Sequence, residues 1–508
     1  MTDSIEGKRN GIYSSMDSLK PKRKIKLRWI VITIIALQSF VLIAIKMCMS
    51  LAVVAMISDV TCKVDNSTGL KSKGCYESDT HREYHVDWSD SQKSRFLQSF
   101  IWGSLGMAIC GGRIAEIYGP RKVASIAILT TGLINLSFPW IARRSYWYSY
   151  LVRLAQGICS AIAVPTSQVI LTRWIPQQEK TIASSIITSG ALFSGALTPP
   201  IVGLMVSGDF LGGWPLVFYS FGATAIIMSV VVFIMIRDDP GKHPLIKQDE
   251  LIEIMQHRLV RKGKAKSLPW GSLLASPAIF AILSANFCYS WTAGFFSQQL
   301  SSFYKDVLHV SYKSNGVMTA LPYIVSILVN YTAGYLVDWL RASEILSTIR
   351  LRKICTFIGY GVYAACLFLI PFVGPHIGTV VILATIAKGF GALNIAGPGS
   401  NHLDICPSFA GTFNGLARTI ADTSQILMNE AVAWLVGDNP TPERWYSTFY
   451  LSAILIVIGA ILYVLLASAK VQHWDPAYRK PDNQQNTIGS PKKAKSEFRV
   501  KVKEEEKY

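Results

Sequence analysis

The sequence predicts an all-α membrane protein with twelve transmembrane helices in two pseudo-symmetric bundles of six. Half of its 508 residues (50%) are hydrophobic and only 16% are charged, and the mean hydropathy is +0.32. A soluble chain of this length would carry about 25% charged residues. A polar stretch, residues 237–272, separates about six membrane-length apolar runs from about six more. A related motif in each half is the third observation behind this fold class.

The first copy of the motif, residues 112–122, is a turn rich in glycine and cations between two long apolar runs. Two spans joined so tightly cross the bilayer in opposite directions, and the positive-inside rule places the cations on the cytoplasmic side. Glu116 can pair with Arg121 and Lys122 across the turn and so latch neighbouring helices. The candidate latch residues here are Gly112, Glu116, Gly119, Arg121 and Lys122.

A weaker copy, residues 334–341, lies in the second half and contains Asp338 and Arg341 as further latch candidates. A single copy would favour a plain helix end followed by a basic turn. Because a copy occurs in each half, the pair favours two related halves, as in many transporters built from internal repeats.

Charge placement predicts the topology. The net charge of +18 lies mostly in the tails and in alternate loops, which is typical of membrane topology and unlike a nucleic-acid-binding patch. No cleavable signal sequence is evident. We expect both termini in the cytoplasm and a chain that works as a monomer. The expected parts are an N-terminal tail (1–27), a first bundle (28–236) with an outer loop (58–94), a linker (237–272), a second bundle (273–470) and a C-terminal tail (471–508).

The long outer loop contains features of a luminal or extracellular segment. Asn66 begins a glycosylation sequon, and Cys62 and Cys75 lie in the same loop. If the loop faces outside, Asn66 can be glycosylated and the two cysteines can form a disulfide. In the linker, residues 249–255 look like a short amphipathic helix on the inner membrane surface.

Two cations lie inside predicted spans. Lys46 interrupts the first apolar run and Arg153 lies near the outer end of the fourth. A cation at bilayer depth costs about 2.5–3.5 kcal/mol on insertion scales, so it usually faces a cavity or a partner. Together the two make an anion-binding site plausible. The alternatives are that Lys46 extends to the outer interface, and that Arg153 is an interfacial anchor or part of a structural ion pair.

The eleventh predicted span, which we call helix 11 and which contains residues 418–430, carries an unusual polar face. Its members recur at spacings of four, three and four residues, which places them on one side of a helix. Arg418 and Asp422, at i and i+4, can form an ion pair. We expect the face to line a central cavity, with Asp422 and then Glu430 as candidate titratable acids; the alternative is a neutralised pair that fixes helix 11 to a neighbour. The polar face consists of Arg418, Asp422, Gln425 and Asn429.

Other classes of chemistry find little support. No glycine-rich phosphate loop occurs, so transport driven by direct ATP hydrolysis is not indicated. His402 and Asp404 lack a third nearby ligand in the sequence, which favours a structural turn over a metal or catalytic pair. We expect no metal, no cofactor, no nucleic-acid partner and no enzymatic activity.

Several segments, in order, resemble one branch of the major facilitator superfamily. They are residues 285–291, 303–308, 315–323, 345–354 and 401–407, the last reading NHLDICP. The branch is the anion:cation symporter family, which includes sialin, the vesicular glutamate transporters and the type I sodium–phosphate cotransporters. The resemblance covers residues 27–475.

The resemblance implies two six-helix bundles that move organic or inorganic anions by alternating access. It also implies an essential cation in helix 1, here Lys46 in place of arginine, and a second in helix 4, here Arg153. Three positions depart from the family pattern, and one of them is Leu97, which stands where the glutamate branch has a histidine in helix 2. Ser160 stands where the family commonly has a carboxylate for proton coupling, and Tyr289 stands where the glutamate branch has a helix 7 arginine. We include Tyr289 with Lys46 and Arg153 as substrate-binding candidates.

The sequence therefore predicts a secondary active transporter of small anions, coupled to Na⁺ or H⁺. An uncoupled anion facilitator is the first alternative, favoured by Ser160. A transporter-like receptor or scaffold that moves no solute is the second. The chain is expected in the plasma membrane or in an endolysosomal or vesicular membrane.

Overall fold

The computed structural model describes residues 26–57, 88, 90–206, 214–256, 269–308, 312–374, 376–437, 441–476 and 478. Throughout this part of the chain the regular structure is helical. Asn66, Cys62, Cys75 and most of both tails lie outside the described residues, so the glycosylation and disulfide hypotheses stay predictions.

The helices run in two sets of six membrane-crossing segments. The first set is α2 (Leu27–Ile57), α3 (Asp90–Ser104) with α4 (Met107–Tyr118), α5 (Pro120–Ala142), α6 (Tyr146–Trp174), α7 (Lys180–Val206) and α8 (Trp214–Met235). The second set is α11 (Pro277–Gln298), α13 (Tyr312–Ala342), α14 (Thr348–Val373), α15 (Ile377–Gly391) with α16 (Pro398–Ile405), α17 (Ala410–Val436) and α18 (Pro442–Leu466). Short helices α9 (Gln248–Gln256) and α10 (Trp270–Leu274) belong to the linker, and α12 (Leu300–Asp306) follows α11.

Ten of these segments are long and apolar enough to cross a bilayer by themselves. The two that are not are α3–α4 and α17. The first is broken at Gly106, whose positive φ of 78° ends one helix and starts the next. The second contains the polar face predicted for helix 11. The break leaves α3 and α4 each too short to span a bilayer alone, with 15 and 12 residues.

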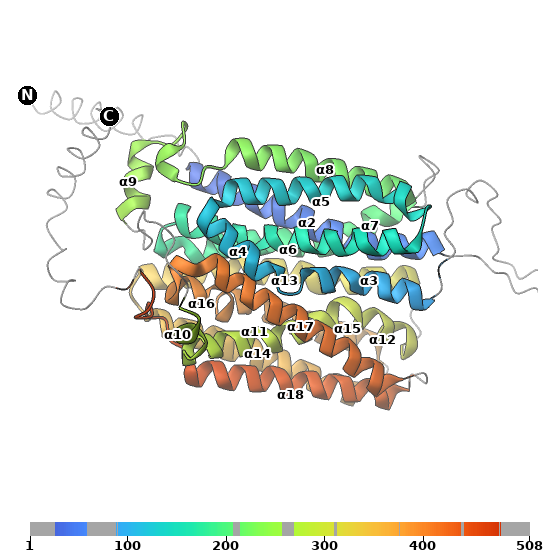
Figure 1. The fold of residues 1–508 in the computed structure, drawn as a ribbon. Helices are drawn as coiled ribbons and strands as arrows, with labels where there is room; N and C mark the ends of the chain where they lie inside the picture. The colour runs from blue at the N-terminus through green and yellow to red at the C-terminus, as the bar shows by residue number, and fades with distance from the viewer. Residues whose placement is uncertain are drawn as a thin grey trace, which may run out of the picture.

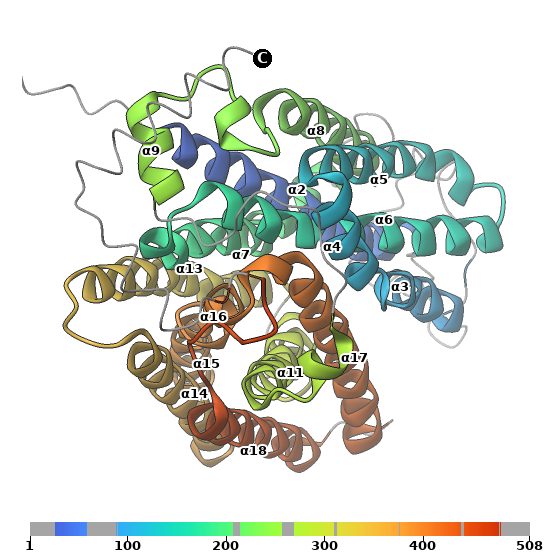
Figure 2. The same ribbon diagram turned by 60° about the vertical axis from the view of Figure 1, so that its left-hand side comes forward.

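Each set of six encloses its own apolar core. One cluster of buried side chains is built mainly from α2 to α8, and a second from α11 to α18. Figure 2 shows the two bundles side by side, with α7 facing α13 and α4 facing α17 where they meet. Large apolar side chains on the outward faces are well exposed, including Leu204 (76%), Ile227 (65%) and Phe372 (67%). Such a belt is expected where helices contact lipid tails.

Both bundles share one end, which we call the linker end. It carries α9 and α16, and in Figure 1 it lies on the left, where α2 begins and α18 ends. The opposite end, where α2 ends and α3 begins, is the loop end. The crossing helices of both bundles run between these two ends (Figure 1). A residue's position along its helix therefore indicates its depth between the linker end and the loop end.

The linker helix α9 is fixed to the start of α2. Glu250 accepts hydrogen bonds from the backbone N–H groups of Leu27 (3.0 Å) and Arg28 (2.9 Å), and so caps that helix. Glu253 pairs with Lys26 (2.7 Å) and Arg28 (2.9 Å). Burial raises the pKa of Glu253, but hydrogen bonds from Arg28 and Lys26 outweigh it, and the net pKa is lower than usual. The short helix predicted in the linker is present as α9, and these contacts fix it to the first bundle.

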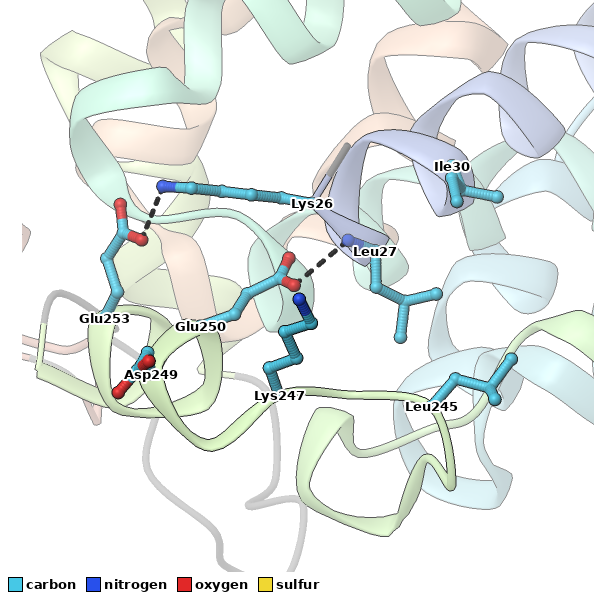
Figure 3. A pocket seen from close by; sticks show the side chains of 8 residues that line it. All are labelled: Lys26, Leu27, Ile30, Leu245, Lys247, Asp249, Glu250 and Glu253. Atoms are coloured by element: carbon cyan, nitrogen blue, oxygen red, sulfur yellow. Dashed lines mark hydrogen bonds and ion pairs between the residues drawn. The ribbon is translucent and has the colours of Figure 1, made fainter. Parts of the chain in front are cut away.

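Figure 3 shows the open cavity of about 460 Å³ beside this contact. Two of its carboxylates already have partners: Glu253 pairs with Lys26, and Glu250 accepts from the backbone at the start of α2. The cavity lies at the edge of the linker end and away from the interface between the bundles. The cavity is therefore part of the contact between the linker and the start of α2, and it is not a candidate substrate site.

Candidate functional site

Lys46 and Arg153 lie together around one aromatic ring in the first bundle. The Lys46 ammonium is 5.6 Å and the Arg153 guanidinium 4.6 Å from the centre of the Phe100 ring. Arg153 Nη2 also donates to the backbone carbonyl of Lys46 at 3.2 Å. Phe100 can lie there because α3 touches α6 closely: a Cβ at Gly157 would be 2.2 Å from the Phe100 carbonyl oxygen. The two predicted cations thus form one site and do not face lipid.

Arg153 is held in place by a chain of amides. It is 2% exposed, and Nη1 donates to Gln156 Oε1. Gln156 Nε2 donates to Asn135 Oδ1 at 3.1 Å, and Asn135 Nδ2 donates to the Phe218 carbonyl at 2.9 Å. Arg153 Nε is buried without an acceptor among the described residues. The guanidinium is therefore oriented by neutral groups, which leave its charge uncompensated.

The second bundle adds an ion pair from α17. Arg418 Nη2 lies 3.2 Å from Asp422 Oδ1, so the pair expected at i, i+4 is present. Ser104 of α3 donates to Asp422 Oδ2 at 2.9 Å, across the interface between the bundles. Asp422 is 1% exposed. The acid is thus held from both halves of the molecule at the break between α3 and α4.

These four charges form what we call the central cluster: Lys46, Arg153, Arg418 and Asp422. Phe100, which carries the Lys46 and Arg153 charges, and Ser104, which contacts Asp422, lie four residues apart on one face of α3. Three cations and one acid leave two positive charges uncompensated. Buried charge of one sign is costly unless it is paired, so the cluster has electrostatics that favour an anion.

The remainder of the predicted polar face is used differently. Asn429 exchanges hydrogen bonds with Gln298 and Gln299, both at 2.9 Å, and Gln425 accepts from Gln298 at 3.3 Å. These amides join α17 to α11 within the second bundle. Glu430 is exposed on another side of the helix. The structure therefore brings Arg418 and Asp422 into the cluster but does not place Glu430 with them.

Ser160 lies on the same face of α6 as Arg153 and Gln156, because spacings of three and seven residues return to one side of a helix. It is 6% exposed, and its hydroxyl has no hydrogen-bond partner among the described residues. A buried, unsatisfied hydroxyl two turns along α6 from Arg153 is suited to a water molecule or a polar ligand atom.

Tyr289 is not part of the cluster. Its ring stacks on Tyr360 with centroids 6.1 Å apart, and the Lys388 ammonium lies 5.9 Å from its centre. Both partners belong to the second bundle. Lys388 of α15 is 5% exposed, and the sequence interpretation overlooked it. The signal was available: a lysine inside an apolar span, as for Lys46.

The interface between α4 and α17 contains the first latch. Glu116 accepts from the Thr412 backbone N–H and from the Thr412 hydroxyl, both at 2.7 Å, at the start of α17. The helices approach so closely that a Cβ at Gly112 would be 2.2 Å from the Gly411 carbonyl oxygen. Glu116 thus uses a helix N-terminus of the other bundle as its partner.

The expected pairing of Glu116 with Arg121 and Lys122 is wrong. Its nearest cation is Arg113, at 3.1 Å and one turn earlier on the same helix. Arg121 instead donates to the Phe233 carbonyl at 2.7 Å, and Lys122 is exposed. The turn directs these cations away from Glu116.

Gly119 has a φ of 96°, which favours glycine. A Cβ there would be 2.6 Å from the Asp238 carboxylate, which accepts from the Arg121 backbone N–H at 2.9 Å. Gly119 and Arg121 therefore tie α5 to the end of α8 inside the first bundle, whereas Gly112 and Glu116 act between bundles.

The interface between α7 and α13 contains the second latch. Asp338 accepts from the Ile182 backbone N–H at 2.7 Å, near the start of α7. Arg341 donates to the Gln177 carbonyl at 2.7 Å and pairs with Asp404 at 2.9 Å. Both residues of the weaker sequence motif thus connect the two bundles.

Asp404 is the centre of this second latch. It is 1% exposed and pairs with the fully buried Arg352 at 3.0 Å as well as with Arg341. Lys180 of the first bundle donates to the neighbouring Leu403 carbonyl at 3.0 Å. From the sequence, the turn around Asp404 is interpreted as structural. The one sequence signal for a role of Asp404 in the latch is that it lies in the NHLDICP segment, residues 401–407.

Metal-binding groups of three or more His, Cys, Asp or Glu side chains do not occur within the described ranges.

Comparison with known proteins agrees with this architecture. The sequence profile described as Major Facilitator Superfamily matches residues 29–429. The chain belongs to this superfamily. Within it, the relatives place the chain in the group of sialin, the vesicular glutamate transporters and the inorganic phosphate cotransporters. Its fold is that of a twelve-helix, multi-pass membrane protein, as the sequence predicted.

Three relatives illustrate the extent of the similarity. The chain is 31% identical over 445 residues to "Uncharacterized transporter slc-17.2" of Caenorhabditis elegans, covering 84% of this chain and 88% of that one. It is 29% identical to human sialin, covering 86% and 88%. A putative inorganic phosphate cotransporter of Drosophila melanogaster is 28% identical, covering 84% and 82%.

Among solved structures, the proton:xylose symporter XylE, bound to 6-bromo-6-deoxy-D-glucose, has the same fold. The TM-score is 0.64 at 12% sequence identity, with 88% of this chain and 97% of that chain covered.

Proposed function

We propose that this major facilitator protein is a secondary active transporter that moves small organic or inorganic anions by alternating access. The observation that supports this most is the central cluster, in which α2, α6 and α17 bring together three cations and one acid. An anion bound there compensates the excess charge, and the two bundles that supply the charges are the two parts that rock in this fold. The named activities of the relatives, on glutamate and inorganic phosphate, point to the same substrate class.

The described contacts correspond to a state closed at the linker end. Both latches and the Asp404 group lie there, and the contact of Ser104 with Asp422 lies further toward the loop end. With the linker in the cytoplasm, this is the state in which the cluster is reached from outside or from the lumen. Release to the other side requires both latches to open.

Asp422 is the acid through which we propose ion coupling. It is the only carboxylate of the cluster, and its partners come from both bundles. Protonation or Na⁺ binding at this group changes its hold on Arg418 and Ser104. Coupling of substrate to cation then follows, because a freed Arg418 adds to the attraction for the anion.

The test is uptake into proteoliposomes containing the full-length protein. Phosphate, urate, sialic acid, glutamate and aspartate are supplied with and without Na⁺ and pH gradients. We expect at least one anion to be accumulated only with a cation gradient. Asp422→Asn is expected to retain binding but lose the dependence on that gradient; an unchanged gradient dependence removes Asp422 from coupling.

Lys46→Met tests the substrate site itself. Loss of one charge-assisted contact, worth about 1.5–3 kcal/mol, lowers anion affinity about 10- to 150-fold. Lys470→Met is the matched control, because Lys470 is an exposed lysine beyond α18. Equal transport by wild type and Lys46→Met would contradict the proposed site.

An uncoupled facilitator is the second candidate, and Ser160 favours it. The position that commonly supplies a proton-coupling carboxylate in this family holds a hydroxyl here. The same assay separates the two: a facilitator equilibrates an anion down its own gradient and never accumulates it. A receptor or scaffold transports no anion in this assay.

We place the chain in the plasma membrane or in an endolysosomal or vesicular membrane, with both termini cytoplasmic and the monomer as the working unit. The named vesicular location of several relatives supports the second location. Fluorescent tagging at each terminus, followed by selective permeabilisation, tests the orientation.

A further inference from the structure

Lys388 is a second buried cation with an unusual environment. Three aromatic rings surround its ammonium group: Tyr323 at 5.5 Å, Phe296 at 5.8 Å and Tyr289 at 5.9 Å from their centres. Its ammonium makes no hydrogen bond or ion pair with any residue that the structure describes. Among the other buried cations of this bundle, Arg352 has Asp404 as its partner. Ring faces attract a cation but do not neutralise its charge.

Lys388 lies on the helix that corresponds to that of Arg153, about one turn further from the loop end. α6 is the fourth crossing segment of the first bundle, and α15 is the fourth of the second. Each carries one buried cation in contact with an aromatic ring. Tyr289 in turn lies on α11, which corresponds to α2, the helix of Lys46. By pseudo-symmetry the Lys388 group is the second bundle's counterpart of the cations in the central cluster.

The group also reaches the interface between the bundles. A Cβ added at Gly195 of α7 would be 3.1 Å from the Tyr323 ring, so this ring packs against the first bundle. Tyr289 and Tyr323 are only half-buried, and their hydroxyls make no hydrogen bonds within the described residues. The ammonium and two phenol groups therefore supply unused donors beside apolar ring walls.

We propose that Lys388, Tyr289 and Tyr323 form a second anion subsite, which binds the carboxylate of an organic anion with an apolar body. This rests on the proposed anion transport. A carboxylate has two oxygens to satisfy, which matches the few donors here, whereas phosphate needs more donors to replace its hydration. The rings of Phe296 and Tyr289 offer apolar surface to the body of the ligand.

Equilibrium binding to the purified full-length protein tests the subsite. Radiolabelled phenylacetate is the probe, and unlabelled acetate and inorganic phosphate are competitors. Wild type is expected to bind phenylacetate saturably, with acetate competing at least tenfold more weakly because it lacks the apolar body. Absence of saturable binding overturns the proposal, and so does displacement by phosphate at lower concentrations than by acetate.

Variants locate the binding. Lys388→Met is expected to weaken phenylacetate binding tenfold or more, and Tyr289→Phe about threefold, while the exposed control Lys470→Met changes nothing. Wild-type affinity in Lys388→Met overturns the proposal. If Lys388→Met does not fold, the double variant Y289F/Y323F keeps the rings and removes the hydroxyls; unchanged binding there also overturns it.

The two proposals fail separately. Loss of the subsite proposal leaves anion uptake that depends on Lys46 but phenylacetate binding that is absent or independent of Lys388. Failure of the transport proposal appears instead as no uptake of any anion by wild type in proteoliposomes, whatever the binding assay shows.

Discussion

The two interfaces between the bundles use the same latch but different interiors. At both, a carboxylate from one bundle accepts the backbone N–H near the start of a helix in the other: Glu116 with Thr412, and Asp338 with Ile182. Beyond the latch, the α4–α17 interface continues to the Asp422 ion pair. The α7–α13 interface continues through neutral groups, with Asn330 donating to Ser185 and Ser189, both at 2.8 Å.

This difference separates two tasks. The α7–α13 interface concentrates its charge at the linker end, around Asp404, where it stabilises closure. The α4–α17 interface leads to the charge of the proposed anion site. Substitutions at the α7–α13 interface should therefore alter stability and the balance of conformations. Substitutions at the α4–α17 interface should alter anion binding as well.

The largest expected effect is at Asp404. Asp404→Ala leaves Arg352, which is fully buried, without its partner, and breaking a buried pair in this way costs about 3–5 kcal/mol. Thermal unfolding in detergent measures the loss. The double variant R352M/D404A should recover much of it, because both charges are then gone. A double variant no more stable than Asp404→Ala would contradict the assigned ion pair.

Next in size is a pair of glycine substitutions. Gly112→Ala forces a Cβ against backbone, 2.2 Å from Gly411 O, whereas Gly334→Ala meets the Ser185 hydroxyl at 2.3 Å. Overpacking costs about 1–3 kcal/mol, and a hydroxyl moves more easily than backbone. We therefore expect Gly112→Ala to open the linker end more than Gly334→Ala does.

Spin labels at the exposed positions 122 and 470, one in each bundle, measure the opening as a distance distribution. Adding Ser185→Gly should return the spin-label distances of Gly334→Ala to those of wild type, and it should not change the distances of Gly112→Ala. Equal opening in Gly112→Ala and Gly334→Ala would contradict the expected difference between the two interfaces.

The smallest effect compares the latch carboxylates. Glu116→Gln and Asp338→Asn keep an acceptor but lose the charge, which weakens a charge-assisted hydrogen bond by about half, roughly 1 kcal/mol or fivefold in the conformational equilibrium. Glu116 accepts two bonds from Thr412, so its variant should shift the equilibrium further. The same spin-label distances report it, and a larger shift for Asp338→Asn would reverse the ranking.

The sequence alone determined the elements of this protein. Twelve crossings, the division at the linker and the latch motifs depend on local hydrophobicity, on helix periodicity and on glycine and charge placement. Lys46, Arg153 and the Arg418–Asp422 pair were visible because charge inside an apolar span is costly, whatever surrounds it.

Only the tertiary structure decided which of these groups meet. Ser104 and Asp422 are 318 residues apart, and Glu116 and Thr412 are 296 apart. Such contacts depend on how each helix is rotated and how closely its glycines let it approach, which no local pattern encodes. That is why Glu116 was assigned the wrong partners, why Tyr289 belongs with Lys388, and why Asp404 became apparent as the centre of a latch only in the folded chain.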